Sequence, residues 1–375
     1  MKQELRAWAE IHIGALCSNL KLAQEQTGTP VMAVIKGDAH GHGAASCGLA
    51  LQEHGAAAFA VACVQEGIDL REAGITKPIL ILGWTPAEYA RELARYDLTQ
   101  SVMSEEYAED LHAAAAAAEV TLHVHAKLDT GMSRTGIFAQ SEHGKAADAI
   151  CRIAAMQHFD LCGIFTHFAA ADVPEKDDFT EWQLSNYRAV LAELEDRGFD
   201  RKVVHHVGNS AGILYHPECR FDMVRAGVML YGFYPNSVHL EDGPLEPVLT
   251  LKARVAQVKE LPAGAKVSYG CLFEAPKPMK IAVVTAGYAD AYPRSLTGKG
   301  AWAVIGGKRC PQIGRICMDM CMFDVTDADV KTGDEVILYG RGGMPMDEIA
   351  ALAGTINCDM TCLLPKRVKK IYIED

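Results

Sequence analysis

The 375-residue sequence predicts an α/β protein, with an N-terminal (β/α)8 TIM-like barrel followed by a mainly β domain. Three observations favour this fold class. Short apolar runs alternate eight times with helix-like stretches, the runs are almost continuously hydrophobic, and the pattern changes to β-type runs after about Tyr234. A doubly wound open sheet would show the same alternation, but no GxGxxG motif follows the first strand.

The eight barrel strands are predicted where mostly apolar runs end at turn or polar residues. They are expected at 31–36, 57–64, 78–83, 98–103, 121–129, 161–168, 203–210 and 223–230. Periodic or alanine-rich stretches between them favour helices. These helices are expected at 43–54, 64–73, 105–118, 143–156 and 178–197.

A second domain is predicted after a linker-like stretch, YPNSVHLEDGPLEP, which contains two prolines and a glycine. Beyond it, glycine turns separate β-type runs such as MKIAVVTAGY and DEVILYG, and only MDEIAALAGTI looks helical. We therefore expect two domains, a barrel over residues 1–238 and a mainly β domain over 239–375.

The composition is that of an ordinary globular protein, with 49% hydrophobic and 22% charged residues. A net charge of −12 argues against nucleic acid or an anionic membrane as a partner. The N-terminus lacks a signal-peptide pattern, and no apolar run reaches the length of about 18 residues that a membrane span requires. Together with 12 cysteines, this predicts a cytoplasmic protein with reduced thiols.

Two cysteine pairs, Cys317 with Cys321 and Cys358 with Cys362, have a spacing of four that invites a zinc interpretation. Neither pair has the two-residue spacing of common structural zinc sites. Their surroundings favour small core residues, so no metal is expected.

Polar residues stand where the predicted strands end, and parallel barrels collect functional groups at that end of their strands. They are Lys36, Lys127, Asp129, His167, Asn209, Ser210, Arg225 and Gly227. Alone, each has an ordinary structural explanation, because strand-end lysines reach water and single histidines are commonly hydrogen-bonded in cores. A desolvated lysine can form Schiff bases, and the glycine-rich turns GHGAA and SAG can hold a phosphate. The combination suggests pyridoxal phosphate, with a class I aldolase as one of several alternatives.

The stretch AVIKGDAHGHG (33–43) resembles the cofactor-lysine signature of the alanine racemases, which are pyridoxal phosphate enzymes of fold type III. Further blocks resemble that family in its own order along nearly the whole chain. They are WAEIHIGAL, KLDTGMSRTG, FTHFAAAD, NSAG, VRAGVMLYG, VSYG, GYADAYPR and GRICMDM. The resemblance implies a (β/α)8 barrel with a β domain, a small amino acid as substrate and a homodimer with shared active sites.

The resemblance implies two catalytic bases. Lys36 would bind pyridoxal 5′-phosphate through a Schiff base and act as one base, and Tyr269 in VSYG would be the second. A racemase removes a proton from one face of a planar intermediate and returns one to the other, so bases on opposite faces are the simplest arrangement. In the family this tyrosine comes from the partner subunit, which would make the dimer obligatory.

Further roles follow from the same resemblance. Arg225 would contact the pyridine nitrogen, with His167 holding Arg225 in position. An arginine keeps its proton, which would leave the ring nitrogen unprotonated and limit side reactions. The remaining cofactor-binding residues would be Asn209, Ser210, Gly227 and Val228. The substrate-binding residues would be Arg134, Met318, Asp319 and Tyr288, and Lys127 would be a carbamylated lysine that positions Arg134.

Two positions depart from the family pattern. His40 replaces a tyrosine that helps to bind the phosphate, and Lys366 stands where a tyrosine precedes the sequence RVPR. Both replacements could still serve a phosphate. They would alter the pocket wall, so a serine racemase, or a racemase for another small amino acid, is the alternative to an alanine racemase.

Three other functions are weaker interpretations of the resemblance. A related amino-acid decarboxylase would have a longer chain and a glycine-triplet phosphate loop. A non-catalytic pyridoxal phosphate carrier would resemble the barrel alone. A degenerate racemase kept for binding would not be expected to retain Lys36, Tyr269, Arg225, Arg134 and His167 together.

Overall fold

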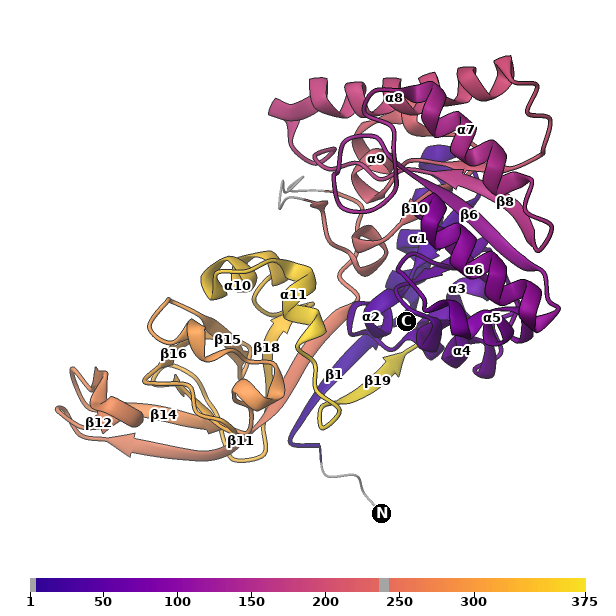
Figure 1. Ribbon diagram of the computed structural model, residues 1–375. Coiled ribbons are helices and arrows are strands. Elements are labelled where there is room, and N and C mark those ends of the chain that lie inside the picture. The colour runs from indigo at the N-terminus through magenta and orange to yellow at the C-terminus, as the bar shows by residue number, and fades with distance from the viewer. Residues whose placement is uncertain (1–4, 236–242) are drawn as a thin grey trace.

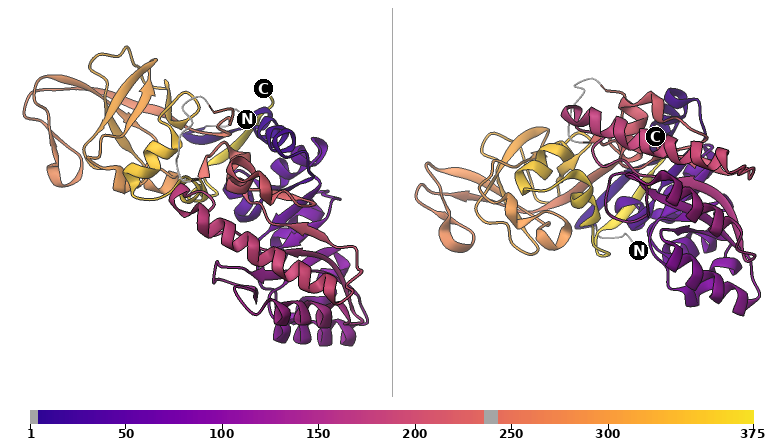
Figure 2. Two further views of the ribbon diagram at one scale, coloured as in Figure 1. Left: turned by 90° about the horizontal axis from the view of Figure 1, so that it is seen from above. Right: turned by 45° about the horizontal axis from the view of Figure 1, so that its top comes forward.

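The computed structural model describes residues 5–235 and 243–375, which form an α/β barrel and a mainly β domain (Figure 1). The two parts lie side by side along one long axis in all views (Figure 2). The expected boundary between residues 238 and 239, with part of the linker-like stretch, lies outside the described residues.

The barrel contains eight parallel strands, each overlapping an expected strand, in the order β10-β2-β3-β4-β5-β6-β8-β9. A parallel bridge between His206 and Met223 joins the two ends of this order. The fold-class prediction is therefore confirmed. The strands are β2 (Val31–Val34), β3 (Ala58–Val61), β4 (Ile79–Ile81), β5 (Leu98–Val102), β6 (Leu122–Asp129), β8 (Phe159–Phe165), β9 (Val204–His206) and β10 (Val224–Ala226).

Helices surround the barrel, and the apolar strand residues are buried from both sides. The five expected helices are present as α3 (Ala44–Glu53), α4 (Val64–Glu72), α6 (Glu105–Ala118), α7 (His143–Ala154) and α8 (Asp177–Asp196). Ser104 shows how a local signal starts one of them, because its side chain accepts a hydrogen bond from the Tyr107 N–H at the start of α6. The elements that were not expected around the barrel include α1 (Ile13–Thr27), α5 (Ala90–Arg95), α9 (Ser210–Tyr215) and the short β7 (Ile137–Phe138).

The second domain is built on an eight-stranded sheet in the order β14-β17-β16-β15-β18-β11-β1-β19. Because β14 also pairs with the long β11, six of these strands close into an antiparallel ring. The strands are β11 (Leu249–Leu261), β14 (Met279–Val284), β15 (Trp302–Ile305), β16 (Lys308–Ile313), β17 (Cys321–Asp324), β18 (Glu335–Gly340) and β19 (Lys369–Ile373). A small hairpin, β12 (Lys266–Val267) with β13 (Phe273–Glu274), extends from the ring, and two helices, α10 (Met346–Ala353) and α11 (Asn357–Cys362), follow β18.

The N-terminal strand β1 (Ala7–His12) belongs to this second sheet, although it precedes the barrel in sequence. It pairs antiparallel with β11 and parallel with β19. The C-terminal part of the chain also packs against the barrel, since α11 lies against α2 (Lys36–His40) (Figure 1). A Cβ atom on Gly41 would lie 2.1 Å from the Thr361 carbonyl oxygen, so only glycine permits this approach. The described helices include none long and apolar enough to cross a membrane.

Candidate active site

A cavity of about 720 Å³ opens at the carboxyl ends of the barrel strands, where a parallel barrel places its functional groups. It brings together ten of the residues that the sequence singled out. They are Lys36, His40, Lys127, Arg134, His167, Asn209, Ser210, Arg225, Gly227 and Val228. Four of the ten are permanently or ordinarily cationic, which suits an anionic cofactor and a substrate carboxylate.

Lys36 begins a left-handed turn, with one residue between it and the end of β2. The five residues from 37 to 41 all have positive φ, including Asp38 at 54°, Ala39 at 55° and His40 at 51°. Left-handed geometry costs an L-residue roughly 1–2 kcal/mol, so three such residues in succession require strong support from their surroundings. The turn presents the Lys36 side chain to the cavity instead of continuing the strand.

Arg225, at the centre of β10, is buried at 2% exposure, and both of its terminal guanidinium nitrogens have hydrogen-bond partners. Its guanidinium donates to the carbonyl oxygens of His206, Thr166 and Val207 at 2.7 to 2.9 Å. It also donates to Nδ1 of His206 at 2.9 Å and to Nδ1 of His167 at 3.1 Å. His167 therefore contacts Arg225 as expected, while His206 is a partner that sequence reasoning missed.

Lys127, near the end of β6, is 6% exposed, and its Nζ donates to the Thr135 hydroxyl at 2.5 Å. Burial, followed by the positive charges of Arg134 and Arg225, lowers the pKa of Lys127 to about 8. A substantial fraction of this amine is consequently neutral in mildly alkaline solution. Arg134 itself is exposed on the loop after β6 and lines the same cavity.

Asn209, Ser210 and Ala211, at the start of α9, border one side of the cavity. The Asn209 side chain caps α9 by accepting from the Gly212 N–H at 2.9 Å, and Ser210 Oγ accepts from the Gly227 N–H at 2.9 Å. First-turn N–H groups of a helix have no intrahelical partner and attract anions. Gly227 and Val228, after β10, border the same side.

His40 adds an unsatisfied polar atom to this cavity. The ring is buried at 8% exposure, its Nδ1 has no hydrogen-bond partner among the described residues, and it packs against Tyr231 at 4.7 Å between ring centroids. Burial lowers the pKa of His40 to about 3, with a further contribution from the Lys36 charge. An anion bound in the cavity would raise the pKa of His40 and so oppose the lowering by burial and by the Lys36 charge.

The other predicted residues lie on the second domain, in a separate group. Tyr269 follows β12, and Ser268 next to it donates to the Arg315 carbonyl at 2.6 Å, beside the segment that holds Met318. Tyr288 donates its N–H to the Cys317 carbonyl at 3.1 Å, which brings it to the same segment. Asp319 accepts from Arg367 at 2.8 Å. None of the four lines the barrel cavity, and Tyr269 is 70% exposed.

Lys366 is also exposed and is not among the residues that line the cavity. The second domain instead contributes Ile356, Asn357 and Cys358 at the start of α11. These three residues were missed because Lys366, further along the chain, was expected to form this wall of the pocket. The signal that could have indicated them is the helix-like stretch MDEIAALAGTI, which ends immediately before Asn357.

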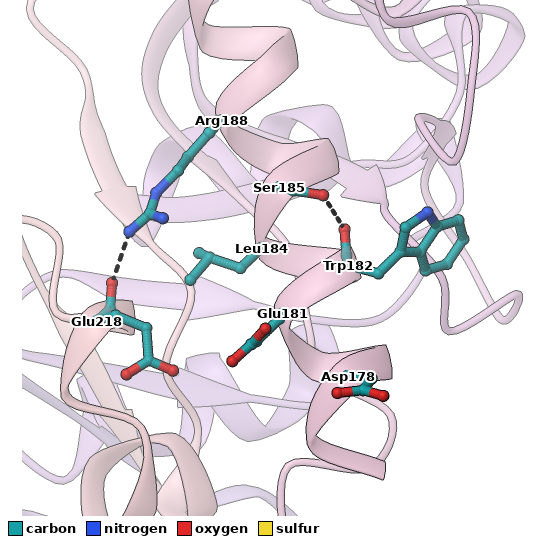
Figure 3. A pocket seen from close by; sticks show the side chains of 7 residues that line it. All are labelled: Asp178, Glu181, Trp182, Leu184, Ser185, Arg188 and Glu218. Atoms are coloured by element: carbon teal, nitrogen blue, oxygen red, sulfur yellow. Dashed lines mark hydrogen bonds between the residues drawn. The ribbon is translucent and has the colours of Figure 1, made fainter.

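A second hollow lies on the outer face of α8 and is lined by Asp178, Glu181, Trp182, Leu184, Ser185, Arg188 and Glu218 (Figure 3). Two of its polar side chains are engaged locally, since Arg188 donates to the Glu218 carbonyl at 3.3 Å and Ser185 to the Trp182 carbonyl at 2.8 Å. It contains none of the predicted residues. Within residues 5–235 and 243–375, no group of three or more His, Cys, Asp or Glu side chains could hold a metal ion.

Comparison with known proteins gives one consistent result. Residues 11–235 match the family model described as alanine racemase, N-terminal domain, and residues 248–372 match alanine racemase, C-terminal domain. The chain is 42% identical to an alanine racemase of Desulfovibrio desulfuricans and 40% identical to one of Desulforamulus reducens, each over 98% of both chains. It is also similar to a solved alanine racemase structure from Clostridium difficile 630, with a TM-score of 0.92 and 36% identity over 100% of this chain and 97% of that one.

Proposed function

Because this chain belongs to the alanine racemase family, we propose that it interconverts L- and D-alanine with pyridoxal 5′-phosphate bound at the barrel mouth. The observation that carries the proposal is the convergence of Lys36, Arg225, Lys127 and Arg134 on one cavity, from four different parts of the barrel. The residues that converge there are the ones that the family motifs designate.

The cavity fits the cofactor in three respects. Lys36 provides an amine at the rim, and Asn209, Ser210 and Ala211 bring the start of α9 to the cavity, where the first-turn N–H groups that remain would face a phosphate. The buried Nδ1 of His40 has no hydrogen-bond partner among the described residues, and the bound cofactor would provide one. Lys366, which is exposed outside the cavity, is not needed in this arrangement.

The reaction divides between the cofactor and the side chains. Pyridoxal phosphate supplies an electron sink for the negative charge that remains when the α-proton leaves. Lys36 holds the cofactor and moves a proton on one face of the substrate, while Arg134 binds the substrate carboxylate. Arg225 is held by three carbonyl groups and would donate to the pyridine nitrogen of the cofactor.

Tyr269 is the proposed second base, and it reaches the cavity from the partner subunit of a homodimer. This is supported by its 70% exposure and its position outside the cavity of its own chain. Tyr288, Met318 and Met320, which belong to the segment 315–320 of the second domain or are bonded to it, are also exposed, at 43%, 52% and 45%. An exposed apolar group of this kind marks an interaction surface. Tyr288 and the Met318 backbone, supported by Asp319, would narrow the partner's cavity and meet the substrate.

Lys127 is proposed to be carbamylated. Its lowered pKa provides the neutral amine that reacts with carbon dioxide, and its position beside Arg134 would let the resulting carboxylate hold that guanidinium.

The twelve cysteines are all free thiols, which supports the proposed cytoplasmic location.

The experiment is chiral chromatography of the purified, cofactor-loaded protein after separate incubation with L-alanine and L-serine. We expect rapid formation of D-alanine and no racemisation by Lys36→Ala. Preference for serine would replace the proposed substrate with the alternative one. Activity on neither amino acid would overturn the proposal.

A further inference from the structure

Glu66, on the first turn of α4, joins the ends of two barrel strands through its carboxylate. Its Oε1 accepts from the Gly37 N–H at 2.7 Å, and its Oε2 accepts from the Ala62 N–H at 2.7 Å. Gly37 directly follows Lys36, and Ala62 follows β3 and lines the cavity. One carboxylate therefore spans the rim between β2 and β3.

The contact matters because Lys36 has no side-chain support of its own. Within the described part of the chain, its ammonium group makes no hydrogen bond or ion pair, and the side chain is exposed to the cavity. Its direction is therefore determined by the backbone on which it stands. That backbone is a left-handed turn, which persists only where neighbouring groups hold it.

The two ends of the turn are held by different carboxylates. At the far end, Asp38 Oδ1 accepts from the Ala44 N–H at 2.8 Å and Oδ2 from Lys370 of β19 at 2.8 Å. At the Lys36 end, the side-chain contact is the one from Glu66. Charge-assisted bonds of this kind are stronger and shorter than neutral ones.

We infer that Glu66 is a positioning residue, which fixes the direction of the Lys36 side chain by holding the Gly37 N–H. Glu66 does not line the cavity, so it acts through the backbone and not by contact with substrate. The inference rests on the proposed racemase function and adds a residue that acts on one of its two bases.

The test compares Glu66→Gln and Glu66→Ala with Asp69→Asn as the matched control. Glutamine keeps the size but has one acceptor oxygen, so either Gly37 or Ala62 loses its partner, and alanine removes both bonds. Asp69 is exposed on the same helix and accepts from Gln65 at 2.7 Å, away from the turn. We expect alanine racemisation to fall about tenfold for Glu66→Gln and about 100-fold for Glu66→Ala. Asp69→Asn should match the wild type.

An isotope effect separates positioning from a general loss of structure. Lys36 removes the α-proton of one enantiomer, so slower transfer by Lys36 should raise the α-deuterium effect on kcat/KM for that enantiomer alone. A merely structural loss would lower the active fraction and leave both isotope effects unchanged. Thermal unfolding of each variant shows whether it folds.

A second measurement does not depend on racemisation. Apo-protein is mixed with pyridoxal 5′-phosphate, and its attachment to Lys36 is followed by absorbance and by borohydride labelling with peptide mapping. Attachment should be slower in both Glu66 variants than in wild type and Asp69→Asn. If the wild type fails to racemise alanine, the proposed function fails and this measurement still decides the role of Glu66. Wild-type attachment rates and isotope effects in folded Glu66 variants would overturn the inference.

Discussion

Arg225 and His206 are joined by a hydrogen bond of 2.9 Å from the guanidinium to Nδ1 of the imidazole. Because arginine only donates, Nδ1 accepts and the proton of a neutral His206 must be on Nε2. That nitrogen lies 2.9 Å from Nδ1 of His125, which accepts in turn. Burial and the charge of Arg225 hold the pKa values of His206 and His125 far below the ordinary value, to about 3 for His125. The neutral imidazoles of His206 and His125 thus form a hydrogen-bonded chain that ends at the buried guanidinium of Arg225.

Replacing Arg225 with methionine should be strongly destabilising. The substitution leaves the buried carbonyl groups of Thr166, His206 and Val207 without their donor. Unsatisfied buried groups cost about 1–3 kcal/mol each, so we expect the free energy of unfolding in urea to fall by about 3 kcal/mol. Arg188→Met is the control, because Arg188 is exposed and makes one bond of 3.3 Å. A loss no greater than that of the control would contradict the expectation.

Acid should destabilise the protein through its buried histidines. Burial lowers the pKa of His42 to about 4, against an ordinary value of 6.5. Between these values the unfolded chain binds a proton that the folded chain does not, so stability falls as the pH falls from 6.5. We expect His42→Asn to reduce the slope of unfolding free energy against pH by about 1.4 kcal/mol per unit near pH 5. His54→Asn, at an exposed position, is the matched control, and a slope for His42→Asn equal to that of the control would contradict the prediction.

Lys127 should have a signature of the same sign, in the alkaline range. Its pKa is about 8 in the folded chain and 10.5 ordinarily, so the unfolded state holds one more proton between these values. Stability should therefore rise with pH in this window, by about 1.4 kcal/mol per unit relative to Lys127→Met. The measurement is urea unfolding from pH 7 to 10 in buffer free of carbon dioxide, which keeps the amine unmodified. A constant difference between the two proteins would show that Lys127 titrates normally.

The eight strands of the barrel could be predicted because each overlaps a mostly apolar run that can be recognised in the sequence. Their ends could not be predicted. The run at 203–210 continues past β9, which ends at His206, because Asn209 caps α9 and the apolar character extends into that helix. The position of β1 was also hidden, since its partners β11 and β19 lie more than 200 residues away in sequence.

The candidate site was predictable where a polar residue ends a strand. It was not predictable where the role depends on contacts between distant segments. Glu66 looks like an ordinary acidic residue in the first turn of a helix, and His206 like one of two adjacent histidines in VVHHVGNS. Alternation along a strand, which turns His206 inward and His205 outward to Tyr187, is the signal that could have identified it. Cys358 carries no such signal, because α11 reaches the cavity only through the packing of the second domain.

Complementation between two inactive variants tests whether Lys36 of one subunit and Tyr269 of its partner act on the same substrate. Lys36→Ala and Tyr269→Phe should each be nearly inactive alone. Coexpressed, they form mixed dimers in which one of the two sites has both residues intact, so we predict recovery of about one quarter of the wild-type alanine racemisation. If the coexpressed proteins stay inactive, Lys36 and Tyr269 do not meet across a dimer.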